Sequence, residues 1–385
     1  MRRVASLIAI NAAVTIVLFF AADFVISHLS IKYRLLPDVF EIQDQQLNHS
    51  FAPNVSNARA IWGRQRYHFS SNSLGYRDAS ARQVEPVSDK PHRIVFTGDS
   101  FAEGIGMPWE DSFVGLFAAA YPNVDVLNAG VRSYSPSIYY REIKRLLDKG
   151  YKFDHVVIYI DISDIQDEAA AYVTDSAGNV VDYKDRPDFG AHVGDKHVDH
   201  IVQPGQEPPL VQLFHKNFLV SRDIVCHLVT LYGWMTHSGP LETERQHQLR
   251  LLRSSWTIYP DLPLGYGEMG VSGGVRKAMD NMTGLADMLR ERNIKFSVGV
   301  YPWPDQVMFD TNESAGVTIW RDWCKAQGCT YFINHFQDIL PGNQGEGDNS
   351  AILDKYYIQG DTHFNVVGNK LIASRLINAF HDELK

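Results

Sequence analysis

Residues 93–101, RIVFTGDSF, join a short apolar run to a tight polar turn. Two later stretches repeat the apolar character, HVVIYI at 155–160 and KFSVGV at 295–300. Strands that are apolar along nearly their whole length are typical of parallel sheets covered on both faces, whereas half-exposed strands alternate apolar and polar residues. These runs therefore predict a buried parallel sheet at the centre of the fold.

Segments with a helical pattern alternate with the apolar runs. Residues 136–149, for example, begin with Pro136, which suits the first turn of a helix, and Gly150 follows as a stop signal. The alternation predicts a three-layer α/β/α sandwich around a flavodoxin-like sheet of five strands. The predicted strands are 93–97, 124–127, 155–160, 295–300 and 330–333, and the predicted helices are 112–121, 136–149, 274–292, 317–327 and 365–384.

The composition is that of a globular protein. Of the 385 residues, 45% are hydrophobic and 21% are charged, which excludes a disordered or coiled-coil chain. The net charge of −9 argues against a nucleic-acid partner held by bulk positive charge.

The first 30 residues are predicted to be a membrane anchor. Residues 4–26 contain a single charge, Asp23, and a helix of this length spans about 35 Å, enough for a bilayer. Arg2 and Arg3 precede the stretch and favour a cytoplasmic N-terminus. A cleaved signal peptide and a buried soluble helix are the alternatives. The preferred interpretation is a single-pass protein of a bacterial inner membrane, with the remaining chain in the periplasm or outside.

The rest of the chain divides into a lead segment, 31–90, which we expect to pack on the core, and a domain at 91–385. A long stretch without the alternation, 165–271, is an expected insertion in that domain. Cys324 and Cys329 would form a short-loop disulfide outside the cytoplasm, and two free thiols are the alternative.

Histidines gather in the insertion, at 192, 197 and 200. Their spacing matches no zinc template, so a solvated polar loop is the preferred interpretation.

Ser100 follows the first predicted strand, at the sheet edge where open α/β sheets bind ligands. A helix that starts there points backbone N–H groups at an anion, although Ser100 in the alternative merely caps that helix. Near the C-terminus, Asp361 lies two residues before His363. An Asp so placed can accept one ring N–H while the other ring nitrogen faces a serine.

Gly98-Asp99-Ser100, together with the C-terminal Asp/His element followed by Asn365 and Gly368, resembles the SGNH, or GDSL, hydrolase superfamily. The resemblance covers roughly residues 91–160 and 295–385. It implies the SGNH hydrolase fold and a serine hydrolase without cofactor or metal. Ser100 would be the nucleophile, His363 the general base, and Asp361 the residue that orients the imidazole.

The resemblance also implies an oxyanion hole made by Ser100, Ser133 and Ser163. Ser133, in the block 128–133, stands where the family usually has glycine, which is tolerable if its φ is negative. Ser163, in the block 161–164, replaces an asparagine, so the third donor has a shorter arm. The family's usual spacing is D-x-x-H, and Gly360 occupies the expected Asp position here.

Variants with D-x-H resemble family members linked to polysaccharide acetylation. The expected function is therefore a serine esterase that removes acyl groups, acetyl first among them, from a cell-envelope or exported glycan through an acyl-serine intermediate. The alternatives are an O-acetyltransferase with the same residues and a catalytically silent glycan-binding or envelope-assembly protein. A small ester is the other expected substrate.

An aromatic turn, residues 301–305 (YPWPD), follows the fourth predicted strand. Its rings would stack on a sugar if they are exposed, and a rigid packed turn is the alternative.

Overall fold

The computed structural model describes residues 2–32, 38–176, 178–183, 253–258, 265–340, 342 and 349–384, together with residues 217, 218, 220, 221 and 224. The chain forms two compact units. One comprises Met1–Asp38 and Gly194–Arg245, and the other comprises Val39–Val193 and Gln246–Lys385. The histidines at 192, 197 and 200 lie outside the described residues, as does most of the predicted insertion.

The second unit is built on a parallel sheet of five strands: β5 (His92–Thr97), β6 (Val124–Asn128), β7 (His155–Ile160), β10 (Lys295–Val300) and β11 (Phe332–Asn334). Their spatial order is β11-β10-β7-β5-β6. In chain order this is 2-1-3-4-5, the flavodoxin-like arrangement, so the predicted sheet is confirmed.

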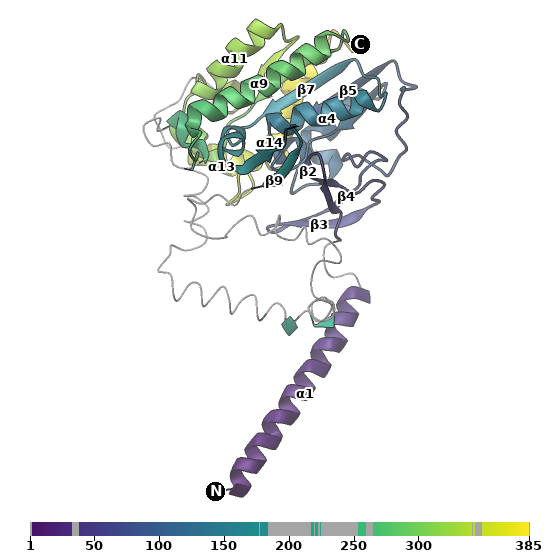
Figure 1. Cartoon of the computed structure of the whole chain (residues 1–385), viewed down its shortest axis with the longest axis vertical. Helices are drawn as coiled ribbons and strands as arrows, with labels where there is room; N and C mark the ends of the chain where they lie inside the picture. The colour runs from purple at the N-terminus through teal and green to yellow at the C-terminus, as the bar shows by residue number, and fades with distance from the viewer. Residues whose placement is uncertain are drawn as a thin grey trace. The chain divides into compact units, whose positions relative to one another are not determined.

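Helices cover both faces of the sheet (Figure 1). One layer contains α4 (Pro136–Asp148), α9 (Gly270–Arg290) and α11 (Ala315–Gln327), and the other contains α3 (Phe113–Ala120) and α14 (Val366–Phe380). Every residue of β6 and β7 is buried, as two covered faces require. The predicted α/β/α sandwich is therefore confirmed.

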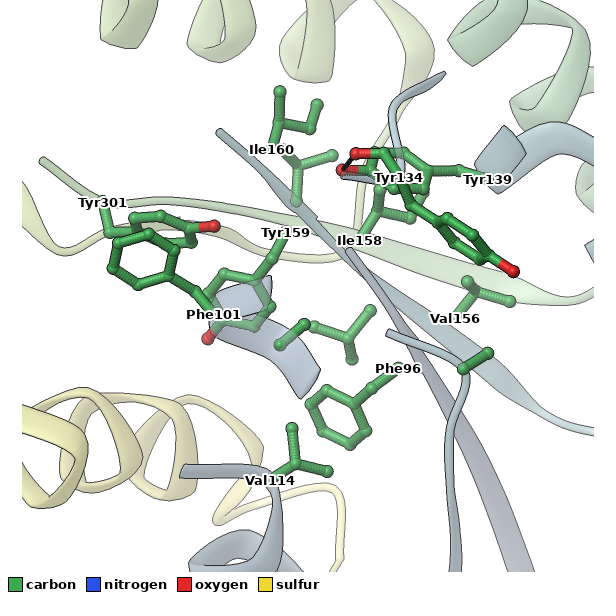
Figure 2. Packing of buried hydrophobic residues seen from close by; sticks show 14 of the residues in the cluster. Phe96, Phe101, Val114, Tyr134, Tyr139, Val156, Ile158, Tyr159, Ile160 and Tyr301 are labelled. Atoms are coloured by element: carbon green, nitrogen blue, oxygen red, sulfur yellow. Dashed lines mark hydrogen bonds between the residues drawn. The ribbon is translucent and has the colours of Figure 1, made fainter. Parts of the chain in front are cut away.

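The core lies on both sides of β7 (Figure 2). Val156 and Ile158 point to one face, while Tyr159 points to the other, because successive side chains of a strand alternate. Tyr159 stacks with Tyr301 at 6.0 Å between ring centroids, and Tyr301 contacts Phe101 at 4.4 Å. Burial of each such side chain contributes about 1.5–3 kcal/mol. This aromatic cluster supports the turn that carries Ser100.

The lead segment forms two antiparallel pairs. One joins β1 (Glu41–Asp44) to β2 (Asn48–Phe51), and the other is a hairpin of β3 (Ala58–Trp62) and β4 (Gln65–Phe69). Phe69 is fully buried and packs against the ring of Phe51. The hairpin thereby presents one face to the apolar core.

Short elements complete the second unit. They are α2 (Ser100–Glu103), η1 (Trp109–Asp111), α5 (Asp164–Gln166), η2 (Asp167–Ala171), the antiparallel pair β8 (Tyr172–Thr174) and β9 (Val180–Tyr183), α10 (Pro304–Phe309), α12 (Phe336–Ile339) and α13 (Ser350–Tyr356).

The first unit contains α1 (Arg2–Lys32), whose stretch Ile10–Leu29 is long and apolar enough to cross a membrane. A signal sequence meets the same criterion. The buried carboxylate of Asp23 accepts the backbone N–H groups of Val220 and Ser221 at 2.9 and 2.7 Å. The single charge of the apolar stretch is thus bonded to the insertion within this unit.

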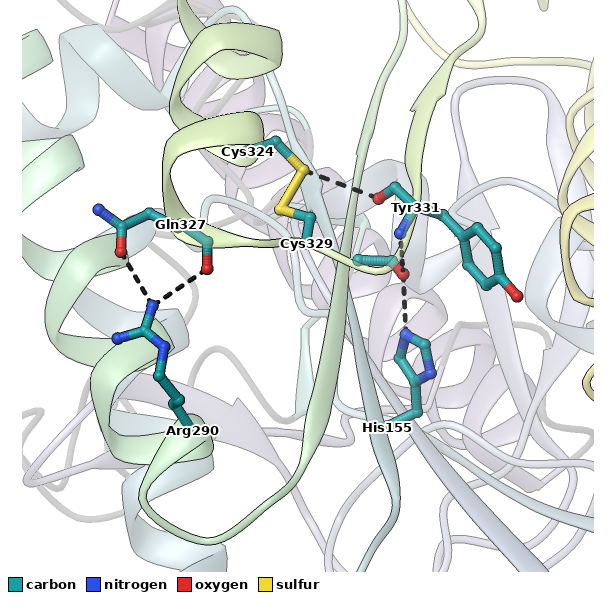
Figure 3. Close-up of a disulfide and its surroundings, with 7 residues drawn as sticks. His155, Arg290, Cys324, Gln327, Cys329 and Tyr331 are labelled. Atoms are coloured by element: carbon teal, nitrogen blue, oxygen red, sulfur yellow. Dashed lines mark hydrogen bonds between the residues drawn. A yellow bond between two sulfur atoms is a disulfide. The ribbon is translucent and has the colours of Figure 1, made fainter.

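A disulfide joins Cys324 in α11 to Cys329 just beyond it, so the alternative of two free thiols is wrong (Figure 3). Gly328 between them has φ of 74°, a left-handed conformation that glycine adopts without strain. The bond closes the turn that leads into β11.

Candidate active site

Ser100 is the first residue of α2, directly beyond the carboxyl end of β5. Asp99 precedes it as the N-cap, and its Oδ1 accepts the backbone N–H of Phe101 at 2.9 Å. The alternative in which Ser100 caps the helix is therefore wrong. At the first helical position, the backbone N–H of Ser100 has no acceptor within the helix and remains available to an anion.

Two glycines bring the second sequence block against this turn. A Cβ added to Gly98 would lie 2.8 Å from the Cβ of Ala102, and one added to Gly130 would lie 2.7 Å from the same atom. The backbone N–H of Val131 also donates to the carbonyl of Gly98 at 3.2 Å. The loop after β6 is therefore packed directly against the start of α2.

The three residues predicted for the triad are joined by hydrogen bonds. His363 Nε2 lies 2.8 Å from Ser100 Oγ, across 263 residues of sequence. His363 Nδ1 lies 2.5 Å from Asp361 Oδ1, which also accepts the backbone N–H of His363 at 2.9 Å. With Nδ1 protonated and bound to the carboxylate, Nε2 is free to accept the proton of Ser100.

A compact turn presents Asp361 and His363 on the same side. The N–H of Ile358 donates to the carbonyl of His363, and the N–H of Asp361 donates to the carbonyl of Ile358, each at 2.9 Å. Asn365 then caps α14, since its Oδ1 accepts the N–H groups of Val367 and Gly368. The turn and the cap fix the imidazole at the start of the last helix.

The carboxylate of Asp361 stays charged at all but strongly acid pH. Burial by itself would raise its pKa, but the charge and hydrogen bonds of His363 and a hydrogen bond from Trp62 lower the pKa to about 2. A charged partner favours the protonated imidazole that forms when Ser100 loses its proton.

Aromatic rings surround the imidazole of His363. Phe101 lies 4.8 Å away between ring centroids, and Trp62 approaches edge-on at 5.3 Å. Beside the triad is a surface hollow whose lining includes Ser100, Phe101, Ile105, His363 and Phe364. Apolar side chains therefore line this hollow together with Ser100 and His363.

Ser133 has a φ of 61°. The condition set for a serine at this position, a negative φ, is therefore not met. The carbonyl of Ser133 accepts the hydroxyl of Tyr172, and the next residue, Tyr134, donates its own hydroxyl to the carbonyl of His49 at 2.7 Å. These contacts hold a conformation that costs a non-glycine residue about 1 kcal/mol or more. Among the described residues, no acceptor is bonded to the N–H of Ser133.

Ser163 is buried beyond the carboxyl end of β7, the strand beside β5. Its N–H donates to Asp161 Oδ1 at 2.5 Å, and its hydroxyl has no bonded partner within the described part of the chain. Neither Ser133 nor Ser163 contacts Ser100 through a hydrogen bond in that part. The structure therefore joins Ser100, His363 and Asp361, and it places the other two serines on the loops that flank Ser100.

The aromatic turn after β10 is packed. Tyr301 and Trp303 are 1% and 5% exposed, and they donate hydrogen bonds to Asp99 and Asp161, respectively. The interpretation of an exposed sugar platform is therefore wrong for these two rings, and the packed-turn alternative holds.

Three buried carboxyl groups, Asp99, Asp161 and Asp164, lie behind the site. Burial, and then the charge of Asp161, raises the pKa values of Asp99 and Asp164 well above the usual range. Asp99 Oδ2 lies 3.5 Å from Ser100 Oγ. A raised pKa favours the protonated form of Asp99.

Trp62 and Phe101 were not predicted as site residues. Phe101 is adjacent to the GDS turn, but nothing in an isolated sequence shows that its ring faces a histidine at position 363. Trp62 lies in the lead segment, 299 residues from Asp361. A separation of this length predicts no contact between the two residues. Among the described residues, no group of three or more His, Cys, Asp or Glu side chains is placed to hold a metal ion.

No protein-family model matches the sequence, and no curated protein matches it. Similar solved structures include the psychrotrophic esterase EstA from Pseudoalteromonas sp., with 12% identity and a TM-score of 0.36, covering 76% of this chain and 98% of that one. A member of the lipolytic protein G-D-S-L family from Veillonella parvula has 10% identity and a TM-score of 0.37, covering 75% and 98%.

An acetylxylan esterase from Geobacillus stearothermophilus has 10% identity and a TM-score of 0.34, covering 75% of this chain and 94% of that one. The neighbours named here are described as esterases or as a member of the G-D-S-L family.

Proposed function

We propose that the chain is an SGNH-type serine esterase that cleaves acyl esters through an acyl-Ser100 intermediate. The observation that carries the proposal is the line of hydrogen bonds from Ser100 Oγ to His363 Nε2 and from His363 Nδ1 to Asp361. Nucleophile, base and orienting carboxylate stand in the order that serine catalysis requires.

The first half of the reaction would acylate Ser100. Its Oγ attacks the ester carbonyl while His363 Nε2 takes the proton, and the carbonyl electrons move onto the oxygen. Collapse of this tetrahedral intermediate expels the alcohol, which receives the proton from His363. In the second half, His363 activates a water that attacks the acyl-serine, and the free acid leaves.

The oxyanion would be held by the N–H of Ser100 and by Ser133 and Ser163 on the flanking loops. The available N–H groups of Ser100 and Ser133 and the unbonded hydroxyl of Ser163 within the described chain support these roles. If Ser163 is the third donor, Ser163→Ala lowers kcat by about 100- to 1,000-fold. A loss of less than threefold would remove Ser163 from the hole.

Acetyl is the preferred acyl group, because the D-x-H spacing of Asp361 and His363 resembles that of family members linked to polysaccharide acetylation. Transfer of acetyl to a sugar hydroxyl instead of water would use the same residues.

An exported glycan is the proposed acyl carrier, and the membrane is the proposed location. The apolar α1 supplies the anchor, and Arg2 and Arg3 at its start favour a cytoplasmic N-terminus. The Cys324–Cys329 disulfide supports an oxidising compartment for the catalytic unit, as in a bacterial periplasm.

The test uses the full chain in detergent with a fluorophosphonate probe and p-nitrophenyl acetate. We expect the probe to label Ser100, and we expect Ser100→Ala to lose both labelling and hydrolysis while retaining its circular dichroism spectrum. A folded wild-type chain that neither reacts with the probe nor cleaves the ester would overturn the proposal in favour of a silent binding protein. Product analysis with and without an oligosaccharide acceptor then separates hydrolysis from transfer.

A further inference from the structure

Trp62 reaches the proposed triad from the lead segment. Its indole Nε1–H donates to Asp361 Oδ2 at 2.8 Å, while the other oxygen, Oδ1, is bonded to His363. The two oxygens of the carboxylate therefore have different partners on different segments of the chain. Neither oxygen can exchange places with the other without breaking a hydrogen bond.

The same indole also contacts the imidazole directly. The rings of Trp62 and His363 meet edge to face, with their planes at 88° and their centroids 5.3 Å apart. Phe101 approaches the imidazole at 4.8 Å. Trp62 is therefore in contact with both residues that would activate Ser100.

Trp62 is itself held in place. It ends strand β3, where its register partner across the hairpin is Gln65. The guanidinium carbon of Arg132 lies 5.7 Å from the centre of the Trp62 ring, and Arg132 forms ion pairs with Glu103 and Glu41, both at 2.7 Å. A cation over an indole face is attracted to it, so Arg132 adds to the fixation of the ring.

We propose that Trp62 is a positioning residue for the esterase, which keeps Asp361 in the rotamer that directs one oxygen at His363. The inference rests on the proposed function. A carboxylate without the indole N–H is free to rotate, and the imidazole then spends less time with Nε2 facing Ser100. Supporting hydrogen bonds of this kind fix the orientation and tautomer of a functional histidine.

The test compares Trp62→Phe with Trp109→Phe, a matched control whose part-buried indole makes no hydrogen bond with the described residues. Rates are divided by the concentration of sites titrated with fluorophosphonate, so that a loss of folded protein does not imitate a loss of catalysis. We expect Trp62→Phe to lower kcat about tenfold with KM within twofold. The control stays within twofold in both constants.

Two readouts separate positioning from general support of the fold. The loss in Trp62→Phe falls on kcat with KM nearly unchanged, because Trp62 acts on the triad and not on the binding of the ester. In an Asp361→Asn background, Trp62→Phe has less than a twofold effect, because the residue through which it acts is already changed.

A Trp62→Phe enzyme with unchanged kcat, a rise in KM alone, or an effect that persists undiminished in the Asp361→Asn background overturns the inference. These outcomes are distinct from a failure of the proposed function, in which the wild-type chain itself shows no labelling and no hydrolysis.

Discussion

The sheet carries a serine, a histidine and a carboxylate at each of its two edges. At the carboxyl edge, Ser100 Oγ lies 2.8 Å from His363 Nε2. At the amino edge, Ser297 Oγ lies 2.8 Å from Nε2 of His155, the first residue of β7. The Ser–His distance is therefore the same in the two sets.

The surroundings of the two serines differ. Ser297 is fully buried in β10, and its Oγ also accepts the N–H of Tyr331 at 3.1 Å. Ser100 is only part-buried and stands at a helix N-terminus beside a hollow. Of these two serines, Ser100 is the one that borders a surface hollow and begins a helix.

The histidines also have different carboxylate partners. Glu383 Oε1 lies 3.7 Å from His155 Nδ1, too far for a hydrogen bond, whereas Asp361 Oδ1 lies 2.5 Å from His363 Nδ1. The comparison shows that the Ser–His distance does not by itself distinguish the two sets. The exposure of the serine and the distance from the histidine to its carboxylate do distinguish the proposed catalytic edge from the other.

The most direct test of the difference between the two edges is to replace each serine in turn. We expect Ser100→Ala to lower kcat by about 10⁶-fold, as loss of the nucleophile does in a serine triad. Ser297→Ala should leave kcat/KM within twofold but lower the free energy of unfolding by about 1–3 kcal/mol, because the part-buried N–H of Tyr331 loses its acceptor. Ester hydrolysis and urea unfolding measure the two effects. A strong loss of activity in Ser297→Ala with intact folding would contradict the comparison.

The carboxylates give the next largest contrast. Asp361→Asn should lower kcat by about 10⁴-fold, because an amide favours the wrong tautomer of the imidazole. Glu383→Gln, its matched control at the amino edge, should leave kcat unchanged. Steady-state kinetics on the same ester measure kcat in both variants. Equal losses of kcat in the two variants would show that the edges are not distinct.

The amino edge should instead control stability in acid. Burial lowers the pKa of His155 to about 4, against a smaller opposing effect of Glu383, whereas an unfolded histidine titrates near pH 6.5. Between those values the unfolded chain binds more protons than the folded one, so stability falls as the pH falls from about 6.5 to 4.

We expect this titration to remove roughly 3 kcal/mol. His49 and His335, whose pKa values are also lowered by burial, add in the same direction. Urea unfolding across this pH range should show a shallower decline in His155→Gln, which cannot titrate. An identical slope in the variant and the wild type would refute the assignment.

The smallest expected effect concerns the strained loop at the reactive edge. Ser133→Gly should raise the free energy of unfolding by about 1 kcal/mol, since glycine adopts a φ of 61° without strain. Activity should stay within twofold, because the backbone N–H is retained. A tenfold loss of kcat would instead assign a role to the Ser133 hydroxyl.

The central sheet was predictable because its signal is local. Continuous apolar runs at 93–97, 155–160 and 295–300 lie within the observed strands β5, β7 and β10. The pairing of Ser100 with His363 was also predictable, but only through the resemblance of short blocks to a family. The φ of Ser133 and the contact of Trp62 were not, because both depend on packing between segments that are distant in the sequence.

By itself, the sequence determined the five strands and the flanking helices of the central sandwich, the apolar α1, and the residue types that carry serine chemistry, but not the strands β1–β4 of the lead segment. These properties follow from side-chain periodicity and turn residues, which act within a few positions of one another. Only the tertiary structure decided which of two Ser–His pairs is accessible, that Trp62 bonds Asp361, and that the rings of residues 301 and 303 are buried. Such facts depend on close packing of side chains brought together from across the chain, and no spacing along the chain encodes them.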